Sequence, residues 1–171
     1  ERIRIGERTF RLIPGAGHSA EHIALYTEDG GQPILISGDM VLPRISTNVS
    51  VFEIEPEANP LDWYLESLRA YEDCAEDTLV LPSHGRPFTK LHVRLGQQHD
   101  HHADRLEVTR KATAEAPISA CDLMPSLFGR RFNTHELTFA LGEALAHLHA
   151  LWYRGELRRE LDGRGVLRFG R

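Results

Sequence analysis

Three short stretches of this sequence share one pattern, which limits the fold more than any other feature. They are GAGHS at residues 15–19, ISGDM at 36–40 and PSHGR at 82–86. In each, a strand-like segment runs into a glycine-bearing turn that carries a His or an Asp. Glycine permits the tight turn that such a position needs. The pattern predicts strand ends that deliver His18, Asp39 and His84 to one edge of a layered α/β sheet.

Strand and helix patterns alternate around these stretches. β-type alternation on both sides of Gly6-Glu7 predicts a hairpin. Asn59-Pro60 predicts a helix start, because Asn caps helices well and Pro fits the first helical position. A buried strand within 77–87 follows that helix, as expected for a layered α/β fold. The intervening residues 43–58 predict a long loop, and long loops often line sites.

A different pattern begins at Pro117. Before it, residues 90–116 contain Gly96 and otherwise no Gly or Pro, which predicts one long connecting helix. After it, Ser119 opens a short helix, a longer helix follows, and Asp162-Gly163 predicts a tight hairpin turn. The longer helix is expected to bury one face, made of Leu137, Leu141, Leu145, Leu148 and Trp152. Helix, helix, hairpin is the outline of a winged helix-turn-helix domain.

We therefore expect a hydrolase-type part over residues 1–89, a connecting helix over 90–116 and a winged-helix-like domain over 117–171. The first residue is Glu1, and a strand pattern follows at once, so the chain is expected to begin in mid-fold. No apolar run approaches the ~20 residues of a membrane helix. No membrane partner is therefore expected. Cys74 and Cys121 form no C-x-x-C pair, which favours a reducing, cytoplasmic location.

Charge argues against nucleic acid as the main partner. The 171 residues include 20 Lys and Arg against 25 Asp and Glu, a net charge of −5. The tail from Tyr153 to Arg171 is locally basic, with a net charge of +3. The candidate recognition helix, TFALGEALAHLHALW at residues 138–152, has few Lys or Arg, which argues against reading a DNA groove. Packing or homodimerisation is the expected role of this domain, and nucleic-acid binding stays the alternative.

His18, Asp39 and His84 together have the chemistry of a metal site. Two imidazoles and a carboxylate suit Zn²⁺ or a similar divalent ion. Such an ion polarises a carbonyl or phosphoryl group and activates water near neutral pH. A lone Gly-His or Gly-Asp is more often ordinary turn chemistry. The prediction therefore rests on the order and spacing of all three.

In that order and spacing the chain resembles the C-terminal half of a metallo-β-lactamase-fold hydrolase, a superfamily that includes glyoxalase II, thioesterases, lactonases and nucleases. PGAGHSAEH is similar to the family's TPGHTxGH stretch, LISGDM to LFSGD, and LPSHGRP to xPGHGxP. The resemblance implies that His18 and His84 hold one metal each and that Asp39 bridges them. Gly15-Ala16-Gly17 matches only loosely, and Ser83 stands where Gly is commoner.

The resemblance also implies a fold: half of an αββα sandwich over roughly residues 8–116. The tail resembles the winged-helix appendage of the subgroup related to lactamase-like endoribonucleases. The family signature His-x-His-x-Asp-His, which supplies further ligands and the Asp that orients the nucleophilic water, has no counterpart before His18. We expect a two-zinc enzyme only when that N-terminal half is present, and weak or absent metal binding by this chain alone.

Three further residues have candidate supporting roles. His22 is expected to support the turn, Arg44 to meet a carboxylate or phosphate of a substrate, and His102 to act as a partner that orients a metal-bound His. His99 and His101 match the first two positions of the missing signature, but Ala103 stands where its Asp belongs. A metal role is therefore not assigned to them.

The function expected from the sequence is metal-dependent hydrolysis of a small ester or thioester. The alternatives are a nuclease or nucleic-acid-binding protein that uses the winged helix, and a metal-free structural or dimerising fragment.

Overall fold

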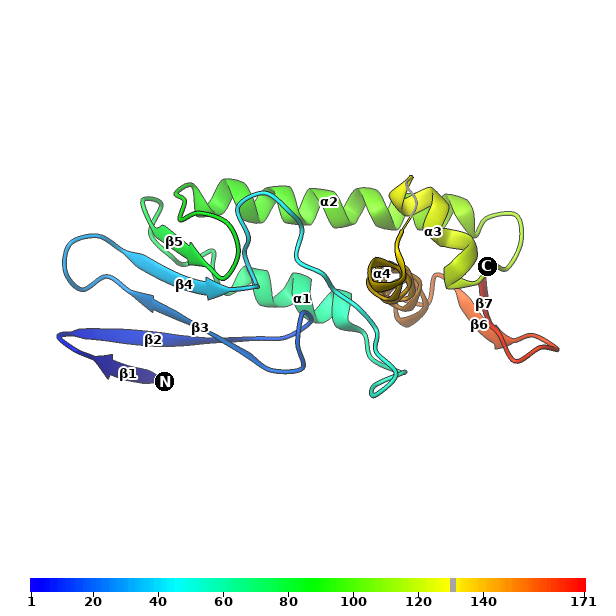
Figure 1. Ribbon diagram of the computed structural model, residues 1–171, viewed down its shortest axis with the longest axis horizontal. Helices are drawn as coiled ribbons and strands as arrows, with labels where there is room; N and C mark the ends of the chain where they lie inside the picture. Colours follow the sequence, from blue (N-terminus) through cyan, green and yellow to red (C-terminus); the bar gives the residue numbers. More distant parts are fainter. Residues whose placement is uncertain (130–131) are drawn as a thin grey trace. The chain divides into compact units, whose positions relative to one another are not determined.

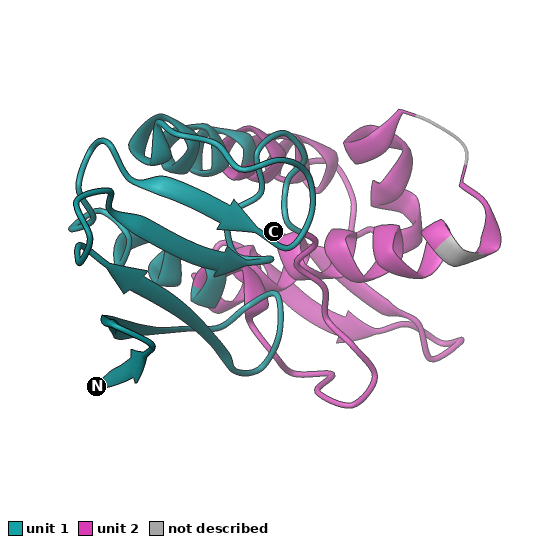
Figure 2. Cartoon of the chain, turned by 60° about the vertical axis from the view of Figure 1, so that its left-hand side comes forward, with its two compact units in different colours: residues 1–47, 63–101 teal, residues 48–62, 102–171 magenta. Residues whose placement is uncertain are grey.

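The computed structural model describes residues 1–129 and 132–171, and it divides the chain into two compact units (Figure 2). Unit 1 consists of residues 1–47 and 63–101, and unit 2 of residues 48–62 and 102–171. Helices α1 (Pro60–Arg69) and α2 (Leu91–Ala112) contribute to both units. By its sequence motifs the chain was expected to divide into residues 1–89, 90–116 and 117–171, whereas the two units are defined by contacts. The three expected regions therefore stay a prediction.

The sheet of unit 1 keeps its strands in sequence order (Figure 1). It consists of β1 (Arg2–Ile5), β2 (Arg8–Gly15), β3 (His22–Thr27), β4 (Ile34–Gly38) and β5 (Leu79–Pro82). Neighbours pair antiparallel from β1 to β4, whereas β4 and β5 are parallel. A parallel pair needs a crossover, which α1 supplies, so the predicted alternation of strand, helix and strand is confirmed.

The two faces of this sheet differ in exposure. One face is buried and carries Ile13, Ala24, Tyr26, Leu35 and Val80. The backbone N–H of Ala75, just past α1, donates to the Tyr26 hydroxyl at 3.0 Å, so the end of the α1 segment lies on that face. On the opposite face, Leu25 pairs with both Leu12 and Ile36, and these side chains remain partly or largely exposed. The apolar alternation therefore buries one face only.

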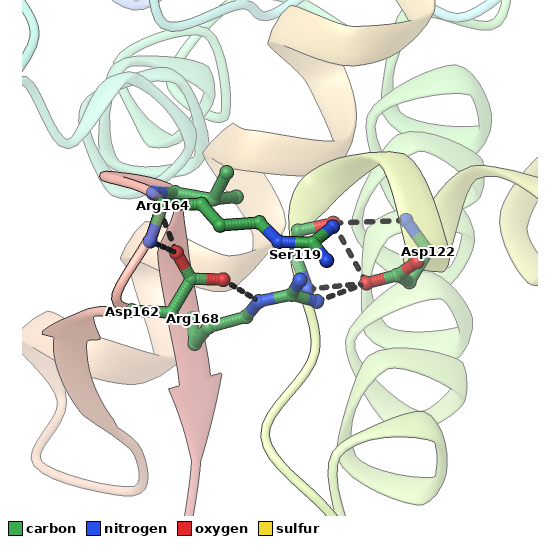
Figure 3. Close-up of polar contacts among 6 residues, drawn as sticks. Ser119, Asp122, Asp162, Arg164 and Arg168 are labelled. Atoms are coloured by element: carbon green, nitrogen blue, oxygen red, sulfur yellow. Dashed lines mark hydrogen bonds and ion pairs between the residues drawn. The ribbon is translucent and has the colours of Figure 1, made fainter.

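Unit 2 contains α3 (Ala120–Phe128), α4 (Thr134–Tyr153) and the hairpin of β6 (Arg158–Leu161) and β7 (Leu167–Gly170). The predicted order of helix, helix and hairpin is confirmed. Ser119 caps α3 in a capping box with Asp122. Arg168 of β7 contacts Asp162 at 3.0 Å and Asp122 at 2.7 Å, which ties the hairpin turn to α3 (Figure 3).

The long helix ends earlier than its sequence predicts. It was expected to continue to residue 116, but α2 stops at Ala112. The Thr113 hydroxyl donates to the carbonyl of Thr109 at 2.9 Å, and the N–H of Ala114 donates at 3.3 Å to the carbonyl of Lys111, only three residues earlier. Pro117 also disfavours helical conformation in the residue before it. These local effects end the helix in a short turn.

The expected buried face of α4 is wrong in part. Leu137 and Leu141 are 43% and 37% exposed, whereas Ala140 and Ala144 are buried. Segment 48–51 of unit 2 explains the difference, because its backbone lies directly against α4. The N–H of Val51 donates to the carbonyl of Gly142 at 3.1 Å. Such a close approach requires small residues on α4. The expected face was chosen from the spacing of large apolar residues, which could not reveal this contact.

No helix within residues 1–129 and 132–171 is long and apolar enough to cross a membrane. Both cysteines are free thiols: Cys121 is exposed and Cys74 is buried. Burial raises the pKa of the Cys74 thiol to about 11, so it stays protonated at neutral pH. A low-pKa thiolate is what nucleophilic cysteines need, so Cys74 serves packing.

Candidate functional site

His18, Asp39 and His84 meet in unit 1. Nε2 of His18 lies 3.5 Å from Oδ2 of Asp39, and Nε2 of His84 lies 3.5 Å from Oδ1 of the same carboxylate. His18 and Asp39 are about one-third exposed, and His84 is largely exposed. The carboxylate therefore stands between two imidazoles and offers a different oxygen to each.

Backbone geometry places each of the three side chains. Asp39 and His84 follow β4 and β5, and because these strands are parallel their carboxyl ends share one sheet edge. The N–H of Ser83 donates to the carbonyl of Gly38 at 3.1 Å, which joins the two turns. On the third segment, Gly17 adopts a φ of 108°, a conformation that favours glycine.

Ser83 has a role that the sequence did not indicate. Its hydroxyl donates a short hydrogen bond to Oδ1 of Asp39. That oxygen is also the one near His84, so the bond fixes the carboxylate from the β5 side. The only signal in the sequence was that Ser occupies a position where Gly is commoner.

His22 lies beside the site, at the start of β3. A Cβ at Gly38 would lie 2.5 Å from Cε1 of His22, so the ring fills the space that glycine leaves. Burial lowers the pKa of His22, against a hydrogen bond with the Ser37 backbone that raises it. Its buried Nε2 has no hydrogen-bond partner within the described residues. The ring is neutral near pH 7, and its expected supporting role stays a prediction.

The turn after β4 is fixed by side chains from the same unit. The Thr47 hydroxyl donates to the carbonyl of Asp39 at 2.6 Å, and the buried Tyr64 hydroxyl donates to that of Met40 at 3.0 Å. Burial raises the pKa of Tyr64 to about 12, so the phenol remains a donor throughout the physiological range. The backbone that carries Asp39 is therefore held in place without any ligand.

A partly open cavity of about 730 Å³ adjoins His84. Its lining includes Pro43, Arg44, Ile45, His84, Arg86 and Phe88. Arg44 was the substrate-contacting candidate from the sequence, and the structure places it beside His84 in this cavity. Arg86 was not singled out, although it stands two residues after His84.

His102 lies in unit 2 and is fully buried. Its Nδ1 is 3.4 Å from Nε2 of His147, whose own Nδ1 is 2.8 Å from the carbonyl of Glu143. The histidine thus belongs to a buried polar cluster on α2 and α4. Its expected role in orienting a metal-bound His stays a prediction.

The ligand-type side chains of this site could contact a divalent ion only two at a time. In the described parts of the chain, no group of three or more His, Cys, Asp or Glu side chains is arranged to hold a metal. His18 with Asp39, and His84 with Asp39, each offer one nitrogen and one oxygen. A structural or catalytic zinc needs at least three protein ligands. Each pair is therefore too small to hold a zinc ion by itself.

Comparison with known proteins identifies relatives over the whole chain. Residues 106–171 match the family described as metallo-beta-lactamase-like, C-terminal domain. The chain is 30% identical over 150 residues to the "Probable metallo-hydrolase YqjP" of Bacillus subtilis (strain 168), and this match covers 85% of this chain and 46% of that protein.

Two solved structures are similar over the full length of this chain. A beta-lactamase domain protein from Burkholderia ambifaria is 58% identical with a TM-score of 0.96, and 50% of it is covered. A metallo-beta-lactamase family protein from Thermus thermophilus is 30% identical with a TM-score of 0.83, and 52% of it is covered. The chain thus has the mixed α/β fold of these proteins and spans about half the length of the relatives it matches.

Proposed function

Starting from this homology to metallo-hydrolases of the metallo-β-lactamase superfamily, we propose that the chain supplies one half of a metal-dependent hydrolase site. The observation that carries the proposal is the position of Asp39 between His18 and His84, with both imidazole nitrogens 3.5 Å from its oxygens. A carboxylate with one imidazole on each side is suited to bridge two ions, and zinc-type ions accept these ligands.

When bound, such ions polarise the substrate carbonyl and lower the pKa of water. The residues of this chain would hold these ions and orient the groups that bind them. His18 and His84 each supply a nitrogen, and Asp39 supplies an oxygen to each side. Ser83 fixes the Asp39 carboxylate by its hydrogen bond. We assign the water-orienting Asp and the remaining ligands to a further part of the fold, because the chain spans about half the length of its relatives, and we expect no hydrolysis by this chain alone.

The open face of the sheet supports a partner layer. Ile3, Ile5, Ile23 and Ile36 are between 38% and 52% exposed on that face. Covering apolar surface contributes roughly 25 cal/mol for each Å² removed from water. We assign this face to the missing half of an αββα sandwich. A second copy of the chain is the alternative occupant, and the oligomeric state of the longer protein distinguishes them.

The substrate that we assign is a small ester or thioester. The net charge of −5 gives no basic channel for a nucleic acid. In the C-terminal hairpin, which we assign to a winged-helix-like domain, basic side chains form ion pairs within unit 2. Arg168 pairs with Asp162 and Asp122, and Arg159 pairs with Glu57 at 2.7 Å. Paired guanidiniums release fewer counterions on meeting phosphate, which favours a packing role.

Metal content tests this proposal. The longer protein, with its N-terminal half, is expected to bind two zinc-type ions per chain, measured by elemental analysis, and to hydrolyse thioesters. Asp39→Asn should lower both ion contents, and His84→Ala mainly one. His99→Ala is the matched control, because it removes a histidine of the same unit outside the site.

Two results would contradict it. Metal content that is unchanged by Asp39→Asn would exclude the bridging role. A metal-loaded protein that cleaves single-stranded RNA but no ester or thioester would establish the nuclease alternative instead.

A further inference from the structure

The cavity beside His84 contains two arginines on neighbouring loops. Arg44 lies on the loop after β4, and Arg86 lies on the loop after β5. Both are exposed. Within the described residues, neither guanidinium forms an ion pair. In a chain with a net charge of −5, two uncompensated arginines in one cavity are available to an anion.

The two loops are in direct contact. Gly85 has a φ of +89°, and a Cβ at this position would lie 2.6 Å from Cγ of Pro43. Only glycine permits this approach. Because Pro43 precedes Arg44 and Gly85 precedes Arg86, the contact sets the two arginine backbones side by side.

The loop that carries Arg44 is fixed from α2. Arg94 donates from Nε to the carbonyl of Leu42 and from Nη2 to the carbonyl of Ile45, both at 2.6 Å. These two carbonyls flank Arg44. The loop is therefore ordered before any ligand arrives, which lowers the entropy cost of binding.

The rest of the cavity wall is apolar. Besides the two arginines and His84, the cavity is lined by Pro43, Ile45, Gly85, Pro87 and Phe88. A ligand that fills it would place a charged group on the guanidiniums and a short apolar segment along this wall. Arginine binds carboxylate and phosphate groups in a planar, two-bond geometry that lysine cannot reproduce.

We propose that this cavity selects anionic substrates. Arg44 and Arg86 bind a carboxylate or phosphate at one end of a small ester or thioester, and the apolar wall covers the chain between that end and the scissile group near His84. This assignment rests on the proposed hydrolase function and specifies its substrate class. Both arginines act as specificity-determining residues, since they contact the substrate away from the reacting atoms.

The test uses the metal-loaded longer protein and three thioesters of equal acyl length. One ends in a methyl group, one in a carboxylate and one in a phosphate. We expect kcat/KM to be higher for a charged substrate, and the comparison of carboxylate with phosphate identifies the preferred anion. Arg44→Gln and Arg86→Gln should each lower the ratio of kcat/KM, charged over neutral, by ~10-fold, as for the loss of one charge-assisted hydrogen bond.

Matched variants separate charge from geometry. Arg86→Lys should recover only part of the ratio, because it keeps the charge and loses the two-bond geometry. Arg69→Gln removes an arginine of the same unit that pairs with Glu66 on the surface of α1, and should leave the ratio unchanged. Equal kcat/KM for all three substrates in the unmodified protein would overturn the inference while leaving the hydrolase function intact.

A binding measurement makes the two proposals distinguishable. In the 171-residue chain, inorganic phosphate or butyrate should shift the side-chain NMR signals of Arg44 and Arg86 saturably, and Arg86→Gln should weaken this binding. Such binding, together with no hydrolysis of any ester or thioester by the metal-loaded longer protein, would contradict the proposed function and keep the anion site. Binding of single-stranded RNA that depends on Arg86, with no response to the small anions, would overturn the inference.

Discussion

Unit 1 and unit 2 treat their apolar side chains differently. Unit 2 buries Phe169, Leu148 and Leu151 completely. Unit 1 buries one face of its sheet and leaves Ile23 and Ile36 on the other face largely exposed. Exposed apolar surface of this kind marks an interaction site more often than an accident. Unit 2 also leaves apolar side chains exposed, such as Ile54, Leu137 and Leu161, but these lie on separate elements, whereas the exposed isoleucines of unit 1 share one sheet face. That face is therefore the one that we assign to a further layer.

Their polar side chains differ in the same way. In unit 2 they are used for structure: Ser119 and Asp122 cap a helix, and Arg168 joins two elements. In unit 1, His18 and His84 come from separate segments and converge on one carboxylate. Side chains that are not needed to cap helices or join elements are available for binding or catalysis. This convergence is why we assign the proposed metal site to unit 1.

The largest expected effect is on stability. Phe169→Ala should lower the free energy of unfolding by ~3–5 kcal/mol, because it empties a fully buried position. Ile23→Ala, at 52% exposure, should cost under ~1.5 kcal/mol in this chain. Denaturant titration of both variants measures the difference. Similar losses would show that the sheet face is covered already and would remove the contrast between the units.

A second difference concerns pH. Burial raises the pKa of Glu143 in unit 2 to about 7, above its usual 4.5. A carboxyl group whose folded pKa is raised stabilises the fold below pH 4.5, and this contribution is lost as pH rises through about 7. The loss is at most roughly 3 kcal/mol. Relative to Glu143→Gln, the unmodified chain should become steadily less stable across this range.

Unfolding titrations at several pH values measure that difference. Subtracting the free energy of unfolding of the variant from that of the unmodified chain cancels the contribution of the histidines that both proteins contain. Glu115→Gln, at an exposed position, is the control and should run parallel to the unmodified chain. A Glu143→Gln variant that also runs parallel would show that folding leaves the pKa of Glu143 unchanged.

The smallest effect separates backbone strain from crowding within unit 1. Gly6 and Gly38 both have positive φ, at 61° and 55°. An Ala at Gly6 would meet nothing within 4 Å, whereas at Gly38 it would meet the His22 ring. Gly6→Ala should cost about 1 kcal/mol from conformation alone, and Gly38→Ala measurably more. Denaturation together with the His22 NMR signal tests this, and equal costs with an unmoved ring would contradict the crowding.

Much of the local structure was predictable from the sequence. Asn59-Pro60 and Ser119 mark helix starts, and Asp162-Gly163 marks the hairpin turn, because capping and turn geometry depend on neighbouring residues only. The end of α2 was less predictable, since Thr113 competes with the helix for its carbonyls. The buried face of α4 was mispredicted, because Gly142 contacts a segment distant in sequence.

The sequence by itself determined which side chains have metal-site chemistry, since His18, Asp39 and His84 each follow a strand and a glycine turn. Only the tertiary structure decided how they combine. The parallel pairing of β4 and β5 sets Asp39 beside His84, Ser83 orients the Asp39 carboxylate, and the contact of Gly85 with Pro43 sets Arg86 beside Arg44. These relations join residues that lie far apart in the sequence, and the physical reason is sheet pairing and loop packing, which no local pattern encodes.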